Sequence, residues 1–367
     1  MSCIGVFYSV RSNGRPNLNE RAIKGNLYIN YFKFRDKKWN YERFWDIGLL
    51  IKDVSDELDK ISFYIPFSIE KDRIQDLGGK LFSSDMLGSL FNHKYQVTNS
   101  TDSRSYAYAK STDDEHPNFW IYELNGNNFS IISLSEGTVI QISINSRPKG
   151  GFIRKADEKE CNLYFRFRIK DVSEKDFGSV ESISNDWLQS AFSKMEMVGL
   201  SINNEQLICK ADSEILLKDN LFLKFEECHF FFIGSSKDER VTGNNRFIEC
   251  MLLDSPQWVQ YVEGHNAKGN KCLSYHWEAQ QLSSPEFFVT TVYSKWDSGK
   301  VVKYLLVVVF LGVLASFIAG VITGKLFSNR PIMIKLQNIE EKIDLSYEKI
   351  SERQLSSTYH IREIDSN

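Results

Sequence analysis

Hydrophobic and polar residues alternate along much of the first 295 residues, a pattern typical of β-strands with one buried face. Residues 138–144 follow it, and aromatic and β-branched runs at 61–67, 118–124, 221–233, 247–253 and 287–293 also predict strands. The clearest case is residues 163–170, where one set of side chains alternates with another: Leu163, Phe165, Phe167 and Ile169 against Tyr164, Arg166, Arg168 and Lys170.

Helical spacing is found at few places. Residues 186–198 place apolar side chains on one stripe, with Asn185 as a candidate N-cap and Gly199 just past the end. Residues 69–77 and 84–91 predict two shorter helices. We therefore expect an α+β fold that is predominantly β, sandwich- or barrel-like, with a few inserted helices.

The β-rich region forms either two modules or one continuous domain. A boundary near 150 is indicated by RPKGG and a charged KADEKE run, giving residues 1–150 and 151–296. The pentapeptide IKDVS occurs at 51–55 and again at 169–173, as two related modules would require. The similarity does not extend beyond five residues, so coincidence is the simpler explanation.

The strongest single feature is an uncharged apolar run at 304–323, YLLVVVFLGVLASFIAGVIT. At about 1.5 Å per residue, a helix of this length crosses the roughly 30 Å hydrocarbon layer of a bilayer. Lysines flank it, and Tyr293, Trp296 and Tyr304 form an aromatic cluster at its start. We expect a single transmembrane helix over 303–326, in contact with membrane lipid.

The side of the membrane is less strongly indicated. The first residues lack a basic segment followed by an apolar segment and a cleavage site, which favours a cytoplasmic N-terminal domain. The Lys and Arg residues on the two sides of the span do not decide the orientation. Six scattered cysteines fit a reducing compartment, and outside it they could form disulfides.

The anchor and the segment after it predict self-association into a homo-oligomer. Small residues recur every fourth position of the span and allow two helices to pack closely: Gly312, Ser316, Gly320 and Gly324. After Pro331, a short helical tail over 331–355 carries an apolar seam that includes Leu336, Ile339, Ile343 and Ile350. An unengaged anchor, and a tail lying on the membrane, are the alternatives; residues 356–367 predict a flexible end.

Composition limits the possible partners. The chain has 45 Lys and Arg against 48 Asp and Glu, a net charge of −3. A general nucleic-acid binder would carry a basic excess, so this class is not expected.

No sequence motif indicates catalysis. The loop at 264–272, GHNAKGNKC, has lost the register of a phosphate-binding loop. Asp113, Asp114, Glu115 and His116 are adjacent and cannot all reach one ion, so they predict a solvated loop. Cys228 and His229 are neighbours on an expected strand and point to opposite faces, so they cannot act on each other. We expect no metal and no cofactor.

The best candidate for ligand binding is a basic row on one strand. Arg166, Arg168 and Lys170 lie on the same face, about 7 Å apart in succession, which suits an anionic ligand or an acidic protein partner. The alternative is an ordinary solvated sheet face.

These patterns favour a non-enzymatic, membrane-anchored binding or sensor protein that self-associates through its transmembrane helix. One alternative is a membrane-disrupting effector of a bacterial defence or toxin-type system. The abundance of Ile, Lys, Asn, Phe and Tyr indicates an A/T-rich gene, which is a frequent trait of mobile or defence loci. The other is a membrane-tethered hydrolase with a dispersed active site, which a pocket of Cys, His and acidic side chains would favour.

Overall fold

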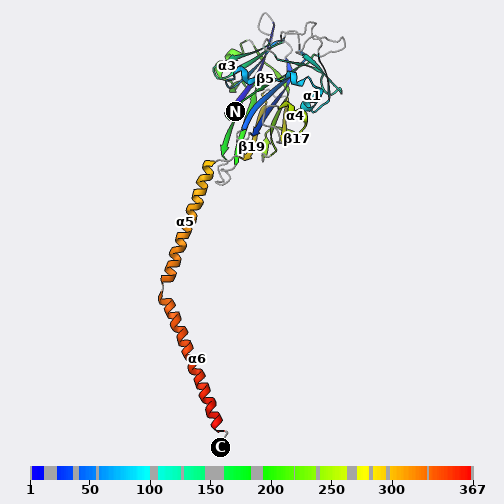
Figure 1. The fold of residues 1–367 in the computed structure, drawn as a ribbon. Coiled ribbons are helices and arrows are strands. Elements are labelled where there is room, and N and C mark those ends of the chain that lie inside the picture. Colours follow the sequence, from blue (N-terminus) through cyan, green and yellow to red (C-terminus); the bar gives the residue numbers. More distant parts are fainter. Residues whose placement is uncertain are drawn as a thin grey trace. The chain divides into compact units, whose positions relative to one another are not determined.

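A computed structural model describes the chain except for residues 1, 12–22, 36–40, 55–57, 100–105, 125–127, 145–160, 183–192, 219, 237–239, 263–270, 281–283, 295–297, 329 and 365–367. Two compact units are present, residues Met1–Trp296 and Asp297–Asn367. The first is β-rich with few helices, as its sequence predicts, and the second is helical (Figure 1).

The first unit contains two open sheets. Sheet 1 has the order β16-β19-β13-β1-β4-β10-β9, with β12 beside β13 and β14 beside β1. Its strands are β1 (Ser2–Val10), β4 (Leu58–Ile65), β9 (Phe129–Ser133), β10 (Thr138–Ser143), β12 (Gly178–Ser182), β13 (Ser193–Ile202), β14 (Leu221–Phe222), β16 (Arg240–Gly243) and β19 (Glu286–Ser294).

Sheet 2 has the order β17-β18-β15-β2-β3-β11-β8-β7-β6, with β5 beside β11. Its strands are β2 (Lys24–Arg35), β3 (Tyr41–Lys52), β5 (Ile74–Asp76), β6 (Tyr95–Asn99), β7 (Tyr106–Ser111), β8 (Phe119–Tyr122), β11 (Leu163–Ile169), β15 (Lys224–Ser235), β17 (Arg246–Leu253) and β18 (Cys272–Gln280). Each path ends in two edge strands, so the described strands form a sandwich and close no barrel.

Helices are short and connect the strands. They are α1 (Ser84–Phe91), α2 (Glu174–Phe177), α3 (Lys210–Leu216) and α4 (Pro256–Tyr261), with 3-10 turns at Lys71–Arg73, Gly78–Leu81 and Glu205–Leu207. The helix predicted at 84–91 is confirmed. The one at 69–77 is wrong, since β5 and a 3-10 turn occupy it. Of the helix predicted at 186–198, residues 193–198 lie in β13 and the rest fall outside the described residues.

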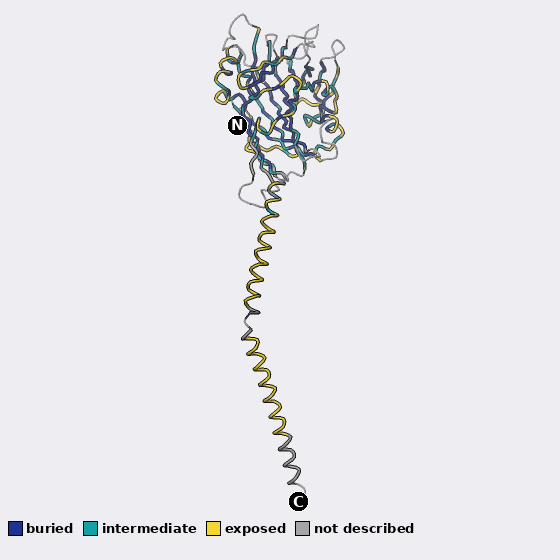
Figure 2. The backbone as a smooth tube through the Cα atoms, turned by 60° about the vertical axis from the view of Figure 1, so that its left-hand side comes forward, coloured by how far each residue is buried: buried dark blue, intermediate teal, exposed yellow. Residues whose placement is uncertain are grey.

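The main core fills the space between the sheets. Phe63 of β4 meets Phe165 and Phe167 of β11, with ring centroids 5.9 and 5.2 Å apart. The apolar set predicted on β11 faces this core, and burial is concentrated along the strands (Figure 2). The alternation in the sequence therefore assigns the inner face of β11 correctly.

One cluster of charges also lies in this core. Glu196 of β13 is 1% exposed and forms ion pairs with Lys33 of β2 at 2.8 Å and Arg43 of β3 at 3.1 Å. Tyr31 donates a hydrogen bond to the same carboxylate at 2.7 Å. Burial raises the pKa of Glu196, but the two cations outweigh it and lower the pKa to about 2. The group therefore joins the two sheets through a buried, ionised carboxylate.

The two IKDVS segments turn in the same way at their Asp residues, at equivalent corners. Asp53 and Asp171 both have left-handed backbone, with φ of 49° and 53°. Each segment follows one of the antiparallel neighbours β3 and β11 and carries the chain toward sheet 1. Val54 donates its N–H to Cys161 O, and Val172 donates to Arg43 O. The repeat thus marks two related corners, while strands from before and after residue 150 contribute to both sheets.

The second unit consists of α5 (Ser298–Ser328) and α6 (Arg330–Ile364). Residues Val301–Lys325 are long and apolar enough to cross a membrane, and none of that window is buried. Where their burial is described, residues of both helices are exposed, apart from the half-buried Val301 and Tyr304 (Figure 2). This unit fits a single-pass membrane anchor near the C-terminal end of the chain.

Candidate functional site

The predicted basic row is not an exposed row. Arg166 and Arg168 are each 1% exposed, and only Lys170 is partly accessible. A second apolar cluster, built from α1, α4 and the strand faces beneath them, covers this outer face of sheet 2. The expectation of an accessible cationic surface is therefore wrong at Arg166 and Arg168.

Both arginines belong to a polar network under α4. Arg168 binds the Asp46 carboxylate through two hydrogen bonds, of 2.7 and 2.9 Å. Tyr261, the last residue of α4, donates its hydroxyl proton to Asp46 at 2.7 Å and accepts a bond from Arg166 Nε at 2.7 Å. The network therefore attaches α4 to the sheet, and anion binding by these arginines stays a prediction that requires α4 to move.

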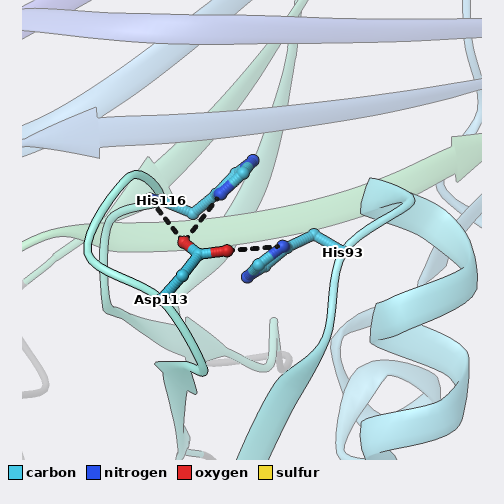
Figure 3. Close-up of side chains that lie close together, drawn as sticks. All are labelled: His93, Asp113 and His116. Atoms are coloured by element: carbon cyan, nitrogen blue, oxygen red, sulfur yellow. Dashed lines mark hydrogen bonds and ion pairs between the residues drawn. The ribbon is translucent and has the colours of Figure 1, made fainter.

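A different cluster brings two histidines and an aspartate together at the surface (Figure 3). His93 follows α1, whose C-cap residue Asn92 has left-handed backbone, and precedes β6. Asp113 and His116 lie in the turn between β7 and β8. One ligand atom from each of the three residues lies within 4.8 Å of the others.

The carboxylate lies between the two imidazoles. Asp113 Oδ1 is 3.0 Å from His116 Nδ1, and Asp113 Oδ2 is 3.4 Å from His93 Nδ1 (Figure 3). Two ligands of a tetrahedral zinc ion at about 2.1 Å are about 3.4 Å apart, so these separations are close to those of a metal site. The donor set, two imidazoles and one carboxylate, also occurs in zinc and non-haem iron sites.

The turn itself positions Asp113. Its Oδ1 accepts backbone N–H groups of Glu115 and His116 at 3.1 and 3.2 Å. The hydrogen bond from the His116 side chain is the main cause that holds the pKa of the Asp113 carboxyl below its usual value. The carboxylate is therefore ionised and fixed near neutral pH, as a metal ligand must be.

Ser111 determines which nitrogen of His93 faces the carboxylate. Its hydroxyl donates to Asp113 Oδ1 at 3.2 Å and lies 2.9 Å from His93 Nε2. Because the Ser111 hydroxyl uses its proton in the hydrogen bond to Asp113, its oxygen accepts a hydrogen bond from His93 Nε2–H. In this tautomer, His93 Nδ1 carries a lone pair that faces Asp113 Oδ2. Two lone pairs repel each other, so this arrangement favours a cation between them.

One feature of the cluster must change when a metal binds. The rings of His93 and His116 are stacked, with centroids 3.8 Å apart and planes 12° from parallel. In-plane lone pairs of two parallel rings do not meet at one point. The His116 side chain is 44% exposed, whereas that of His93 is 11% exposed and held by Ser111. His116 is therefore the ring that would turn if a metal ion were bound by all three residues.

The sequence interpretation of 113–116 as a solvated loop describes its exposure but omits His93. The two segments are brought together because β6 pairs with β7 and β7 with β8, which places the loop before β6 beside the turn before β8. The loop that holds His93 and the turn that holds Asp113 and His116 are therefore close only because of the strand order, which the sequence alone does not give.

A pair of histidines lies elsewhere on sheet 2. His229 Nδ1 is 3.0 Å from His276 Nε2, and His229 Nε2 is 3.4 Å from Glu227. Burial lowers the pKa of His276 to about 3, with His229 adding to the effect, so His276 is neutral near pH 7. Cys228 faces the core, where burial raises its pKa, as expected for a residue that does not act with His229.

The residues predicted to associate lie on the two long helices. Among the described residues, no heavy atom outside the local helix backbone lies within 4 Å of a Cβ added at Gly312, Gly320 or Gly324. Ser316 donates its hydroxyl to Gly312 O at 2.9 Å. The tail residues are between 49% and 57% exposed: Leu336, Ile339, Ile343 and Ile350. Self-association through these residues stays a prediction.

No family profile and no curated protein matches this chain. Among solved structures, an M1 zinc metallopeptidase from Deinococcus radiodurans is similar at 10% identity and a TM-score of 0.25. The alignment covers 75% of this chain and 43% of that chain. A TM-score this low assigns neither a fold nor an activity to the chain.

The expectation of a non-enzymatic binding or sensor protein does not agree with the activity in that neighbour's name. The non-enzymatic sensor is not proposed again. The neighbour itself supports no activity for this chain, so any function must rest on the chemistry of the described side chains.

Proposed function

We propose that the chain is a membrane-anchored, metal-dependent hydrolase with His93, Asp113 and His116 as its metal ligands. The observation that carries the proposal is the convergence of two imidazole nitrogens on a fixed, ionised carboxylate. Three protein ligands leave a coordination position open for water, which is the arrangement of catalytic zinc sites.

Each residue has a separate task in this proposal. Asp113, held by the backbone of its own turn, supplies the negative charge that attracts the ion. His93 offers Nδ1 because Ser111 holds its Nε2, and hydrogen bonds of this kind orient metal-bound histidines. His116 leaves the ring stack and completes the set. A bound divalent ion would lower the pKa of its water and polarise a substrate oxygen.

The anchor limits where such an enzyme acts. Residues Val301–Lys325 fit a membrane span, and the β-rich unit precedes them in the chain. A hydrolase attached in this way meets substrates at or near a membrane surface. Its substrate class is open, so the test uses several ester and amide reporters.

The test begins with metal binding by the full chain in detergent. The protein is stripped with a chelator, and Zn²⁺ is titrated against a chromophoric competitor. We expect one tight site that Asp113→Asn weakens about 100-fold or more and Ser111→Ala weakens about 10-fold. The matched control, Asp114→Asn, removes a neighbouring carboxylate outside the cluster and should leave the affinity unchanged.

Activity is measured on the same samples. Nitrophenyl esters, nitrophenyl phosphates and aminoacyl nitroanilides are offered with and without Zn²⁺ or Mn²⁺. Metal-dependent turnover that Asp113→Asn abolishes and Asp114→Asn retains would support the proposal. A protein that binds no ion, or that hydrolyses a reporter equally well after Asp113→Asn, would overturn it.

A further inference from the structure

A cavity of about 230 Å³ lies between α4 and the outer face of sheet 2. Its walls are mainly apolar and include Phe32, Phe34, Ile233, Leu253, Trp258 and Val262. An apolar cavity of about 150 Å³ is known to hold benzene, so this one has room for a single ring or branched alkyl group with a few further atoms.

Two opposite charges also line this cavity. Asp254 follows β17, Lys271 precedes β18, and both side chains are exposed. The antiparallel register pairs Leu253 with Cys272, so Asp254 and Lys271 follow at the same end of the two strands. Both residues therefore lie at one end of the strand pair that lines the cavity.

This combination specifies a ligand with an apolar group and two adjacent opposite charges. We propose that the cavity binds a free α-amino acid with a large apolar side chain. The side chain enters the apolar walls, the ammonium faces Asp254 and the carboxylate faces Lys271. This site shares no residue with the His93, Asp113 and His116 cluster, so the proposal of amino-acid binding is independent of the proposed hydrolase.

The probe is 4-fluoro-L-phenylalanine, observed by ¹⁹F NMR with the full chain in lipid nanodiscs, where no detergent competes for the cavity. A ligand of this size should bind with a Kd of about 1 mM. Unlabelled L-phenylalanine and L-leucine should displace it. Phenethylamine lacks the carboxylate and 3-phenylpropionate lacks the ammonium, so each should compete about fivefold more weakly.

Variants locate the binding. Asp254→Asn and Lys271→Met should each weaken the probe about fivefold, and Val259→Trp, at an exposed lining residue, should block entry. Asp85→Asn and Lys210→Met remove exposed charges elsewhere and should change nothing.

Three results would overturn the proposal. They are absence of probe binding, binding that the cavity variants do not alter, and equal competition by toluene, octanoate or either singly charged analogue. The last result would identify a general apolar or acyl-chain site.

Discussion

Arg168 shows how far an alternating pattern can be trusted at the level of one residue. The pattern assigns it correctly to the face opposite the main core, yet its side chain is 1% exposed because α4 and its neighbours cover that face. Alternation distinguishes two faces of a strand, but it does not reveal whether a distant segment covers the polar one. Asp46 and Tyr261, far away in the sequence, make the burial of Arg168 tolerable.

Removing Arg168 should therefore be costly. Arg168→Met leaves the Asp46 carboxylate buried without its bidentate partner, and breaking a buried pair costs about 3–5 kcal/mol. The urea midpoint of the full chain, followed by tryptophan fluorescence, should fall accordingly. Lys170→Met, on the same face but partly exposed, should change it little. A combined Asp46→Leu and Arg168→Met variant should recover only part of the loss, because it removes the isolated carboxylate but leaves the buried Arg166 without its nearby anion.

Glu196 predicts a pH dependence of stability. Its pKa is about 2 in the folded chain, below the usual 4.5, so the folded state favours the ionised form. The resulting stabilisation is complete above the unfolded pKa and is lost as pH falls through the folded pKa, from about 4.5 to about 2. It amounts to about 3 kcal/mol at most.

The measurement compares Glu196→Gln with the unmodified chain by urea unfolding at several pH values. The variant should be less stable at pH 7, and the difference should narrow below pH 4. A constant difference across this range would show that the carboxylate charge is not what stabilises the core.

The candidate metal site marks a limit of sequence reasoning at residue scale. Asp113 and His116 are near each other in the chain, whereas His93 lies in a separate segment that no sequence motif links to them. Its proximity depends on the order β6-β7-β8, which a single sequence does not specify.

At the scale of elements, the prediction is wrong for short segments whose apolar spacing fits a helix and a strand equally well. Part of the segment 186–198 has apolar residues at helical spacing, yet its described part, from residue 193, is β13. Pairing with β19 and β12 on its two sides determines this outcome, and the pairing with β19 is non-local. Strands with a long, regular alternation, such as β11 and β10, were predictable because burial of one face agrees with local preference.

The paired IKDVS corners give a prediction for one element boundary. Asp171 has φ of 53°, a region that costs most L-residues about 1–2 kcal/mol and that Asp and Asn tolerate better. Asp171→Ala should therefore lower stability by about 1 kcal/mol, while Asp171→Gly should be neutral or stabilising. The same two substitutions at Asp53, to Ala and to Gly, should have the same effects on stability. If the alanine and glycine variants have the same stability in thermal unfolding at both sites, the left-handed backbone is not what makes Asp favourable at the two corners.

At the scale of the molecule, the association of anchors remains to be tested. A Gly320→Leu substitution should push two packed helices apart, because a branched side chain occupies the position where the backbones meet. Cross-linking in native membranes should then yield less oligomer. Val313→Leu adds bulk on another face and serves as the control. Equal cross-linking of Gly320→Leu and the unmodified chain would mean that the small residues are ordinary membrane-helix composition.

The order of strands has a consequence for how the chain is made. β1 lies between β4 and β13, and β2 lies between β3 and β15, so both early strands have a neighbour that is synthesised much later. The last strand, β19, ends at Ser294, and α5 begins at Ser298. On a ribosome, the sheets therefore stay unfinished until the anchor itself is being translated, and the open edges of β1 and β2 are exposed meanwhile. Maturation of the β-rich unit and delivery to the membrane become nearly simultaneous events, in which a chaperone that shields strand edges would determine the yield.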